Sequence, residues 1–220
     1  ADYELPLAYH VTRASANDGP HLLPLVEQLD QKHPQLLENT AYLSADKGYD
    51  SKENNGVLWD VYAIKPIIDI RNTWREDPEL PRSLSPERVD TIFYTEKGQV
   101  LCRNRDDQPK EQDNYTPMAF QGFEPDRQTL KYRCPAVAKG EPCTQRELCN
   151  GGCHSQYGRV VRVPLAQDRR VFTPQARDSK TWKSEYKHRS AVERVNGRLD
   201  LSFGFEHHFI RGQKKMQLRC

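Results

Sequence analysis

The segment Ala41-Tyr42-Leu43-Ser44-Ala45-Asp46-Lys47-Gly48-Tyr49-Asp50-Ser51 decides the fold class of this 220-residue chain. Its first five residues are a short, mainly apolar run typical of a buried strand, and the polar residues that follow predict a turn, which Gly48 makes easy to close. Ser51 has the side chain of a helix N-cap, so we predict a helix directly after it. Residues 62–68 are a second apolar run and predict another strand.

The residues before this segment continue the same alternation. Residues 5–12 form a short β-prone run with Pro6 near its start, where a missing N–H is tolerated. Leucine and valine then recur at helical spacing, which predicts a helix over residues 21–31. Strands that alternate with helices indicate an α/β sheet.

The middle of the chain, residues 73–180, has a different composition. It contains ten of the 15 prolines and shows few helical periods. Short strands are predicted at residues 91–94, 100–102, 130–133 and 159–163. We therefore expect a loop-rich, mainly β module that is either a second domain or a large insertion.

From about residue 180 the pattern becomes helical again. Val192, Val195 and Leu199 form a narrow apolar stripe, and Gly204 is expected to end the helix. Steps of three and four residues place five polar side chains on one other stripe of the same helix: Tyr186, Arg189, Glu193, Asn196 and Asp200.

Composition excludes several classes of protein. Apolar residues are 36% and charged residues 29% of the chain, and no apolar run approaches the ~20 residues of a membrane helix. The first ten residues do not form a secretory leader, so we expect a cytoplasmic protein. The net charge is −5 over residues 1–72 and +5 over residues 181–220. This asymmetry favours a chain that holds cations near one end and meets a polyanion with the other, although ordinary surface charge also accounts for it.

Two carboxylates are the candidates for chemistry. Asp46 follows a buried strand, at the edge where open α/β sheets place ligands, and Glu193 lies on the amphipathic helix. They are 147 residues apart and can share a site only where the intervening module loops out. Two such groups suit phosphoryl transfer with two Mg²⁺ ions. The alternative is that Arg189 and Glu193 form an ordinary i,i+4 surface pair.

These segments resemble bacterial insertion-sequence transposases of the DDE type over nearly the whole chain. The resemblance rests on residues 5–12 with Asn17-Asp18, on the Ala-Asp-Lys-Gly-Tyr-Asp-Ser turn that contains Asp46, and on the Tyr-x-x-Arg-x-x-x-Glu helix. It implies an α/β, RNase H-like fold with a mixed sheet flanked by helices. Residues 1–72 begin that core, residues 73–180 are an insertion with a cysteine cluster, and residues 181–220 complete the core.

The resemblance also implies roles for particular residues. Asp46 corresponds to the second Asp and Glu193 to the Glu, which hold Mg²⁺ or Mn²⁺ for DNA strand cleavage and strand transfer. Tyr186 and Arg189 are the accompanying signature residues. The family's first Asp lies upstream of residues 5–12, and Asp2 is too close to them to take its place, so we expect an N-terminally incomplete polypeptide whose activity alone is in question.

A second departure concerns the signature helix, where the family carries a basic residue seven positions after the Glu. Position 200 is Asp, and Arg198 is the nearest substitute. The basic residues of segment 181–220 are expected to contact the DNA backbone of the transposon ends and of the target. They are Arg194, Arg198, Arg211, Lys214 and Lys215. The resemblance also implies that the chain acts on paired DNA ends as a homodimer, in the bacterial cytoplasm and in association with the nucleoid.

The cysteines predict a zinc site in the middle module. Clustered cysteines in an intracellular chain favour metal over disulfides. The expected ligands are Cys102, Cys134, Cys143 and Cys149, with Cys153 as the rival fourth ligand. Structural thiols without metal remain the alternative, and no pair has the Cys-x-x-Cys spacing of a zinc ribbon. Cys220 is expected to be a lone thiol, and His207 and His208 to be solvated or packed rather than ligands.

Two other functions remain open at this point. One is a non-catalytic DNA-binding or zinc-binding remnant of a transposase, and the other is a metal-dependent nuclease of the same fold.

Overall fold

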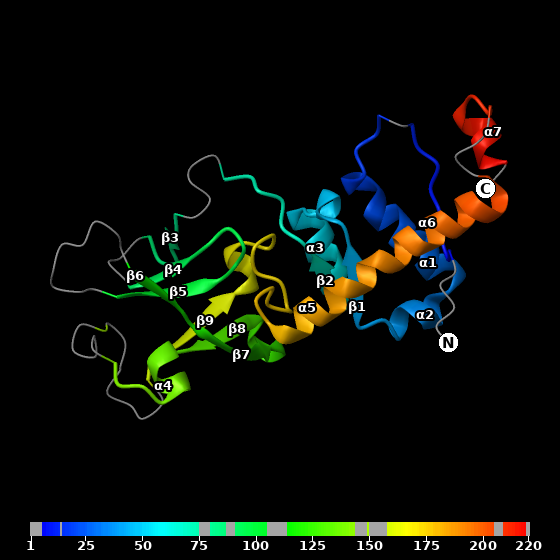
Figure 1. Cartoon of the computed structure of the whole chain (residues 1–220). Coiled ribbons are helices and arrows are strands. Elements are labelled where there is room, and N and C mark those ends of the chain that lie inside the picture. The colour runs from blue at the N-terminus through cyan, green and yellow to red at the C-terminus, as the bar shows by residue number, and fades with distance from the viewer. Residues whose placement is uncertain are drawn as a thin grey trace. The chain divides into compact units, whose positions relative to one another are not determined.

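A computed structural model describes residues 6–13, 15–74, 80–86, 91–104, 114–143, 149, 158–204 and 209–218 (Figure 1). The chain divides into two compact units, Ala1–Asp69 with Ser184–Cys220 and Ile70–Lys183. None of the helices in the described part of the chain combines the length and apolar character of a membrane span. The assignment of the second unit as an insertion in an RNase H-like core stays a prediction.

The first unit is built on two parallel strands, β1 (Tyr42–Ala45) and β2 (Lys65–Ile68). Helix α3 (Lys52–Asp60) connects them, as the sequence predicted, and the Ser51 hydroxyl accepts a hydrogen bond from the Asn54 amide at 3.0 Å. The register pairs Ala45 with Ile68, so both strands end at the same level.

Apolar residues of these strands pack on the helices of the first unit. Helix α1 (Leu22–Lys32) follows the 3₁₀ turn η1 (Gly19–His21) and precedes the short helix α2 (Pro34–Glu38), which confirms the helix predicted from leucine spacing. The buried members of this core come from α1, α2, α3, the strands and the turn before β2: Leu22, Val26, Leu37, Ala45, Leu58, Ile64 and Ile68. The core therefore fixes the depth of β1 and the position of its C-terminal end.

The strand predicted at residues 5–12 is not formed over its described part, residues 6–12. Side chains rather than a neighbouring strand hold this segment: the Tyr9 amide donates to Gln28 Oε1 at 3.3 Å, and Gln213 Nε2 donates to the Val11 carbonyl at 2.7 Å. An extended segment needs a hydrogen-bonded neighbour to become a strand, and β propensity alone does not supply one.

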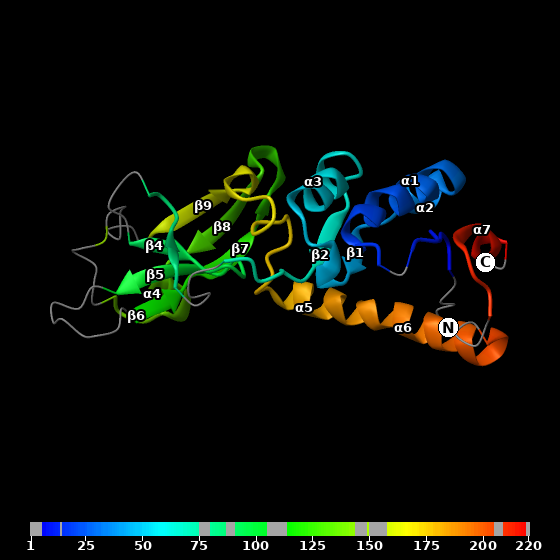
Figure 2. The ribbon, with the colours of Figure 1, turned by 90° about the horizontal axis from the view of Figure 1, so that it is seen from above.

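The helix predicted from residue 180 is interrupted. It consists of α5 (Lys180–Tyr186), the 3₁₀ turn η5 (Lys187–Arg189) and α6 (Ser190–Phe203), which follow one another as one run in Figure 2. Gly204 ends α6 with φ +57°, as expected. Val192, the first residue of the predicted apolar stripe, is 60% exposed. A short helix, α7 (Gln213–Gln217), lies near the end of the chain.

The described residues of the second unit form two antiparallel sheets. One has the order β3-β4-β5-β6, with β3 (Arg82–Ser83), β4 (Ile92–Tyr94), β5 (Val100–Asn104) and β6 (Asn114–Pro117). The other has the order β7-β8-β9, with β7 (Ala119–Glu124), β8 (Thr129–Arg133) and β9 (Val160–Pro164). Helix α4 (Pro135–Lys139) lies between β8 and β9 in the chain. All four strands predicted here are present as β4, β5, β8 and β9, whereas β3, β6 and β7 were not predicted.

A buried carboxylate organises the start of the second unit. Glu96 is 2% exposed, and its Oε1 accepts hydrogen bonds from the amides of Thr73 and Trp74 and from Arg170 Nη2 at 3.1 Å. Arg170 also donates to the Arg71 carbonyl at 2.6 Å. The Glu96–Arg170 ion pair therefore anchors residues 71–74, at the start of the second unit.

Candidate functional site

The C-terminal edge of the parallel sheet carries two acidic residues. Asp46 follows β1 directly, and Asp69 follows β2 directly. Because Ala45 pairs with Ile68 in parallel register, the two aspartates leave neighbouring strands at the same edge. This is where open α/β sheets bind ligands. The prediction had selected Asp46 by its place after a buried strand; Asp69 satisfies the same rule and was missed.

Asp46 also shapes the turn that follows it. Its Oδ1 accepts a hydrogen bond from the Lys47 amide at 2.8 Å and caps the 3₁₀ turn η2 (Lys47–Tyr49). Burial, and then the negative charges of Asp18 and Asp46, raise the pKa of the Tyr49 phenol. The edge therefore has a negative electrostatic environment in which the phenol stays neutral.

The signature residues stand on three successive elements rather than on one helix. Tyr186 ends α5, Arg189 ends η5 and Glu193 lies in the first turn of α6. Arg189 Nη1 lies 3.1 Å from Glu193 Oε1, and the guanidinium carbon lies 5.7 Å from the centroid of the Tyr186 ring. The three side chains form a connected line along the helical run.

Two observations connect this line to the acidic edge. The Ser44 hydroxyl, on β1, donates to the Glu185 carbonyl at 3.1 Å. Burial raises the pKa of the Tyr186 phenol, and the charges of Asp69 and Asp46 raise it further against the opposing effect of Arg189. The charges of both aspartates thus reach the Tyr186 phenol, whose ring lies beside the Arg189 guanidinium.

Hard divalent cations fit the chemistry of these donors, because Mg²⁺ binds through one or two carboxylates and completes its shell with water and phosphate oxygens. Asp46, Asp69 and Glu193 are oxygen donors of this kind. Among the described residues, however, no three His, Cys, Asp or Glu side chains are gathered closely enough to hold a metal. The Glu193 side chain is 63% exposed and is engaged by Arg189.

The predicted zinc ligands lie in the second unit. Cys102 is on β5, and Cys134 precedes α4 and is buried, whereas Cys143 and Cys149 are half-buried. The part of the chain that the structure describes does not assemble them into a metal site. The rival ligand Cys153 lies outside the described residues, as do His207, His208 and Cys220. The zinc assignment stays a prediction.

The cations predicted to contact DNA are on the surface of the first unit. Arg194 and Arg198 are exposed on α6. Arg211, Lys214 and Lys215 are exposed before and on α7. Their side chains are accessible, and their contact with DNA remains a prediction.

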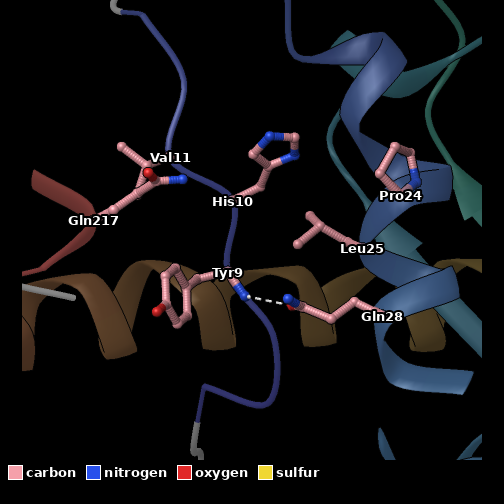
Figure 3. Close-up of a pocket in the computed structure, with 7 residues that line it drawn as sticks. All are labelled: Tyr9, His10, Val11, Pro24, Leu25, Gln28 and Gln217. Atoms are coloured by element: carbon pink, nitrogen blue, oxygen red, sulfur yellow. Dashed lines mark hydrogen bonds between the residues drawn. The ribbon is translucent and has the colours of Figure 1, made fainter. Parts of the chain in front are cut away.

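A surface pocket of about 380 Å³ lies elsewhere in the first unit (Figure 3). The pocket lies between the N-terminal segment, α1 and α7. Its lining residues are Tyr9, His10, Val11, Pro24, Leu25, Gln28 and Gln217. None of the predicted site residues lines it, so the pocket and the acidic edge are separate features.

The site thus combines acidic groups at a sheet edge with an arginine and a phenol on an adjacent helical run. The chain matches the family model of the transposase DDE domain over residues 1–220, and it belongs to that family. This confirms the resemblance seen in the sequence, and the family supports a transposase function with DNA as substrate and divalent metal as cofactor. No curated protein and no solved structure matches the chain significantly.

Proposed function

We propose that this chain is the catalytic part of a DNA transposase that cleaves and transfers DNA strands with the help of Mg²⁺ or Mn²⁺. The observation that carries the proposal is the shared edge of β1 and β2, where Asp46 and Asp69 emerge from neighbouring strands. Ser44 of β1 bonds to the Glu185 carbonyl, next to the Tyr186, Arg189 and Glu193 side chains. Membership of the transposase family supports the same conclusion.

In this proposal Asp46 and Glu193 hold the divalent cation, and Asp69 is a further oxygen ligand. The bound cation would activate the attacking oxygen and stabilise the leaving oxygen of the phosphodiester. The protein's own residues bind and orient the DNA. The raised pKa of Tyr186 keeps its hydroxyl protonated, so it donates a hydrogen bond to a phosphate oxygen. Arg189 offers a planar fork that matches a phosphate group.

Glu193 has to exchange partners for this arrangement to work. Its carboxylate is paired with Arg189 at 3.1 Å, on a side chain that is 63% exposed. An exposed i,i+4 pair contributes only about 0.3–0.5 kcal/mol, so a divalent cation together with a DNA phosphate is able to replace it. Glu193 would then be able to hold the metal, and Arg189 would be able to bind the phosphate.

The test is Mn²⁺ binding, measured by electron paramagnetic resonance, together with nicking of supercoiled plasmid. Asp46→Asn and Glu193→Gln are each expected to weaken Mn²⁺ binding and to slow nicking by about 100-fold or more, because several kcal/mol of metal stabilisation are lost. Asp69→Asn is expected to act in the same direction.

The matched controls are Asp30→Asn and Glu38→Gln, which remove the same charges from exposed positions on α1 and at the end of α2. They should leave both readouts unchanged. Nicking and Mn²⁺ binding that survive in the Asp46 and Glu193 variants would contradict the proposal.

A non-catalytic DNA-binding protein is the second candidate. It is favoured by the Arg189–Glu193 pair and by the lack of an assembled metal group among the described residues. DNA binding without Mn²⁺ binding or nicking would establish it. We also propose that the transposase acts as a homodimer. Sedimentation of the chain with and without DNA would test this.

A further inference from the structure

One face of the sheet β7-β8-β9 carries three cationic side chains. Lys131 on β8 pairs directly with Arg162 on β9, and Arg133 lies two residues further along β8. Alternate residues of a strand share a face, so all three point to the same side of the sheet. We call Lys131, Arg133 and Arg162 the cationic face.

The opposite side of this sheet faces the core of the second unit. Leu130 is 1% exposed, and Tyr132 and Val163 are both 0% exposed. The side chains of Lys131 and Arg162, in contrast, are 38% and 39% exposed. The sheet therefore has one dry face and one that is open to solvent and charged.

The pairing on the open face is unfavourable for the sheet itself. Like charges directly opposite each other on neighbouring antiparallel strands destabilise the pair, and Lys131 faces Arg162 in this way. Glu124 on β7 offsets part of the repulsion: it lies 3.8 Å from Lys131 Nζ, and Arg162 donates to both its oxygens at 2.8 and 3.3 Å. Glu124 thus engages two of the three cations, Lys131 and Arg162.

The Arg162–Glu124 pair also shows that a planar oxyanion fits this face. The hydrogen bonds from Arg162 hold the pKa of the Glu124 carboxyl below its usual range, so the acid is ionised at neutral pH. The arginine fork thus binds an anion in the two-pronged geometry that also suits a phosphate group. Because the pair is on the surface, its partner is exchangeable.

We propose that the cationic face is a second DNA contact of this chain, which binds the backbone phosphates of a duplex. The inference rests on the proposed function in that DNA is the substrate. The backbone positions of these residues are about 6.7 Å apart along β8 and about 4.8 Å apart between strands, so their side chains form a compact cluster that neutralises neighbouring phosphates. Glu124 occupies Arg162 when DNA is absent, and a phosphate replaces it when DNA binds.

The experiment measures binding of the whole chain to a fluorescently labelled duplex, by anisotropy, across a series of KCl concentrations. The triple variant K131Q/R133Q/R162Q is expected to reduce the slope of log affinity against log salt by about 2.7, from about 0.9 for each of three phosphate contacts. An unchanged slope would overturn the proposal.

The matched control removes the same number of charges from the second unit at exposed positions outside the β7-β8-β9 sheet and its β7–β8 turn, with K97Q/K139Q/K180Q. It alters net charge equally and is expected to keep the slope of the unsubstituted chain. Equal loss in the two triple variants would show a general charge effect and would also overturn the proposal.

The single variant E124Q gives an independent test that does not remove a cation. It is expected to strengthen DNA binding several-fold, because the neutral amide no longer competes with phosphate for Arg162. Weaker or unchanged binding by E124Q contradicts the proposal, even where the triple variant fails to fold.

The same measurements separate this inference from the proposed function. Loss of Mn²⁺-dependent nicking in Asp46→Asn, with normal DNA binding, supports the catalytic assignment and does not depend on the cationic face. Unaltered DNA binding in K131Q/R133Q/R162Q refutes the cationic face and leaves the catalytic assignment in place. A chain that binds no duplex even at low salt refutes the cationic face.

Discussion

Removal of the Arg170 guanidinium is expected to destabilise the second unit strongly. Glu96 is 2% exposed, and the Arg170 side chain is 11% exposed, so Arg170→Met leaves a buried carboxylate without its cationic partner. Breaking such a pair from one side costs about 3–5 kcal/mol. The variant also loses the hydrogen bond from Arg170 to the Arg71 carbonyl.

The companion variant tests whether the cost comes from the stranded charge. In Glu96→Gln/Arg170→Met the amide oxygen still accepts from the Thr73 and Trp74 amides, and the amide nitrogen replaces Oε2, which has no hydrogen-bond partner among the described residues. A neutral group costs much less to bury than a charge, so the double variant should recover most of the loss.

Urea denaturation provides the assay. Trp74 is bonded to Glu96 through its amide and lies under the Arg82 guanidinium at 3.8 Å, so its fluorescence reports on this region once Trp59 and Trp182 are replaced by Phe. With a slope of about 2 kcal/mol per molar urea, a loss of 4 kcal/mol moves the midpoint by about 2 M. Lys97→Met, at an exposed neighbouring position, is the control. Equal shifts for Arg170→Met and Lys97→Met, or no recovery in the double variant, would refute the reasoning.

Two further predictions follow from the second unit. Burial raises the pKa of Glu96, but hydrogen bonds from Thr73, Trp74 and Arg170 outweigh it and hold the pKa below its usual value. Stability from this group is therefore present above about pH 4.5 and is lost as the pH falls through the lowered pKa, and acid titration of the urea midpoint should show this component in the unsubstituted chain and not in Glu96→Gln. Gly98→Ala should cost about 2 kcal/mol or more of unfolding free energy, because Gly98 has φ +78° and a Cβ there would lie 2.8 Å from the Val171 carbonyl oxygen. Gly48→Ala, where a Cβ meets nothing within 4 Å, should shift the urea midpoint little by comparison.

The sequence predicted elements well where an apolar run and a local terminator agreed. The run before Asp46 and the cap at Ser51 produced β1 and α3 as expected. Residues 6–12 had comparable β propensity, yet no strand of the described chain pairs with them. Pairing depends on residues distant in sequence, so propensity cannot reveal it.

The break in the helical run was not visible in the sequence because neither glycine nor proline marks it. The Ser190 hydroxyl donates to the Lys187 carbonyl at 3.1 Å and accepts from Arg194 at 2.9 Å. A serine that bonds back to the preceding turn competes with the helical ladder and bends the chain, which accounts for the 3₁₀ turn at η5. Predicting this would require knowing which rotamer Ser190 adopts.

The acidic edge shows most clearly what pattern reading omits. A carboxylate after a buried strand was the rule that selected Asp46, and Ile67-Ile68-Asp69 meets the same rule. The sequence could not show that β1 and β2 are parallel neighbours in register, and that pairing is what brings the two aspartates to one edge. In an antiparallel pair they would leave from opposite edges.

The same geometry sets an electrostatic condition on the proposed chemistry. The negative charges of Asp46 and Asp69 both raise the pKa of the Tyr186 phenol. Glu193, on the same helical run as Tyr186, is paired with Arg189. Bringing Glu193 toward that edge adds repulsion between carboxylates, which a divalent cation relieves and a monovalent arginine relieves only in part. In the proposed function the cation and the DNA phosphate would therefore act together: the metal would make the convergence of carboxylates favourable, and the phosphate would bind the arginine that the metal displaces.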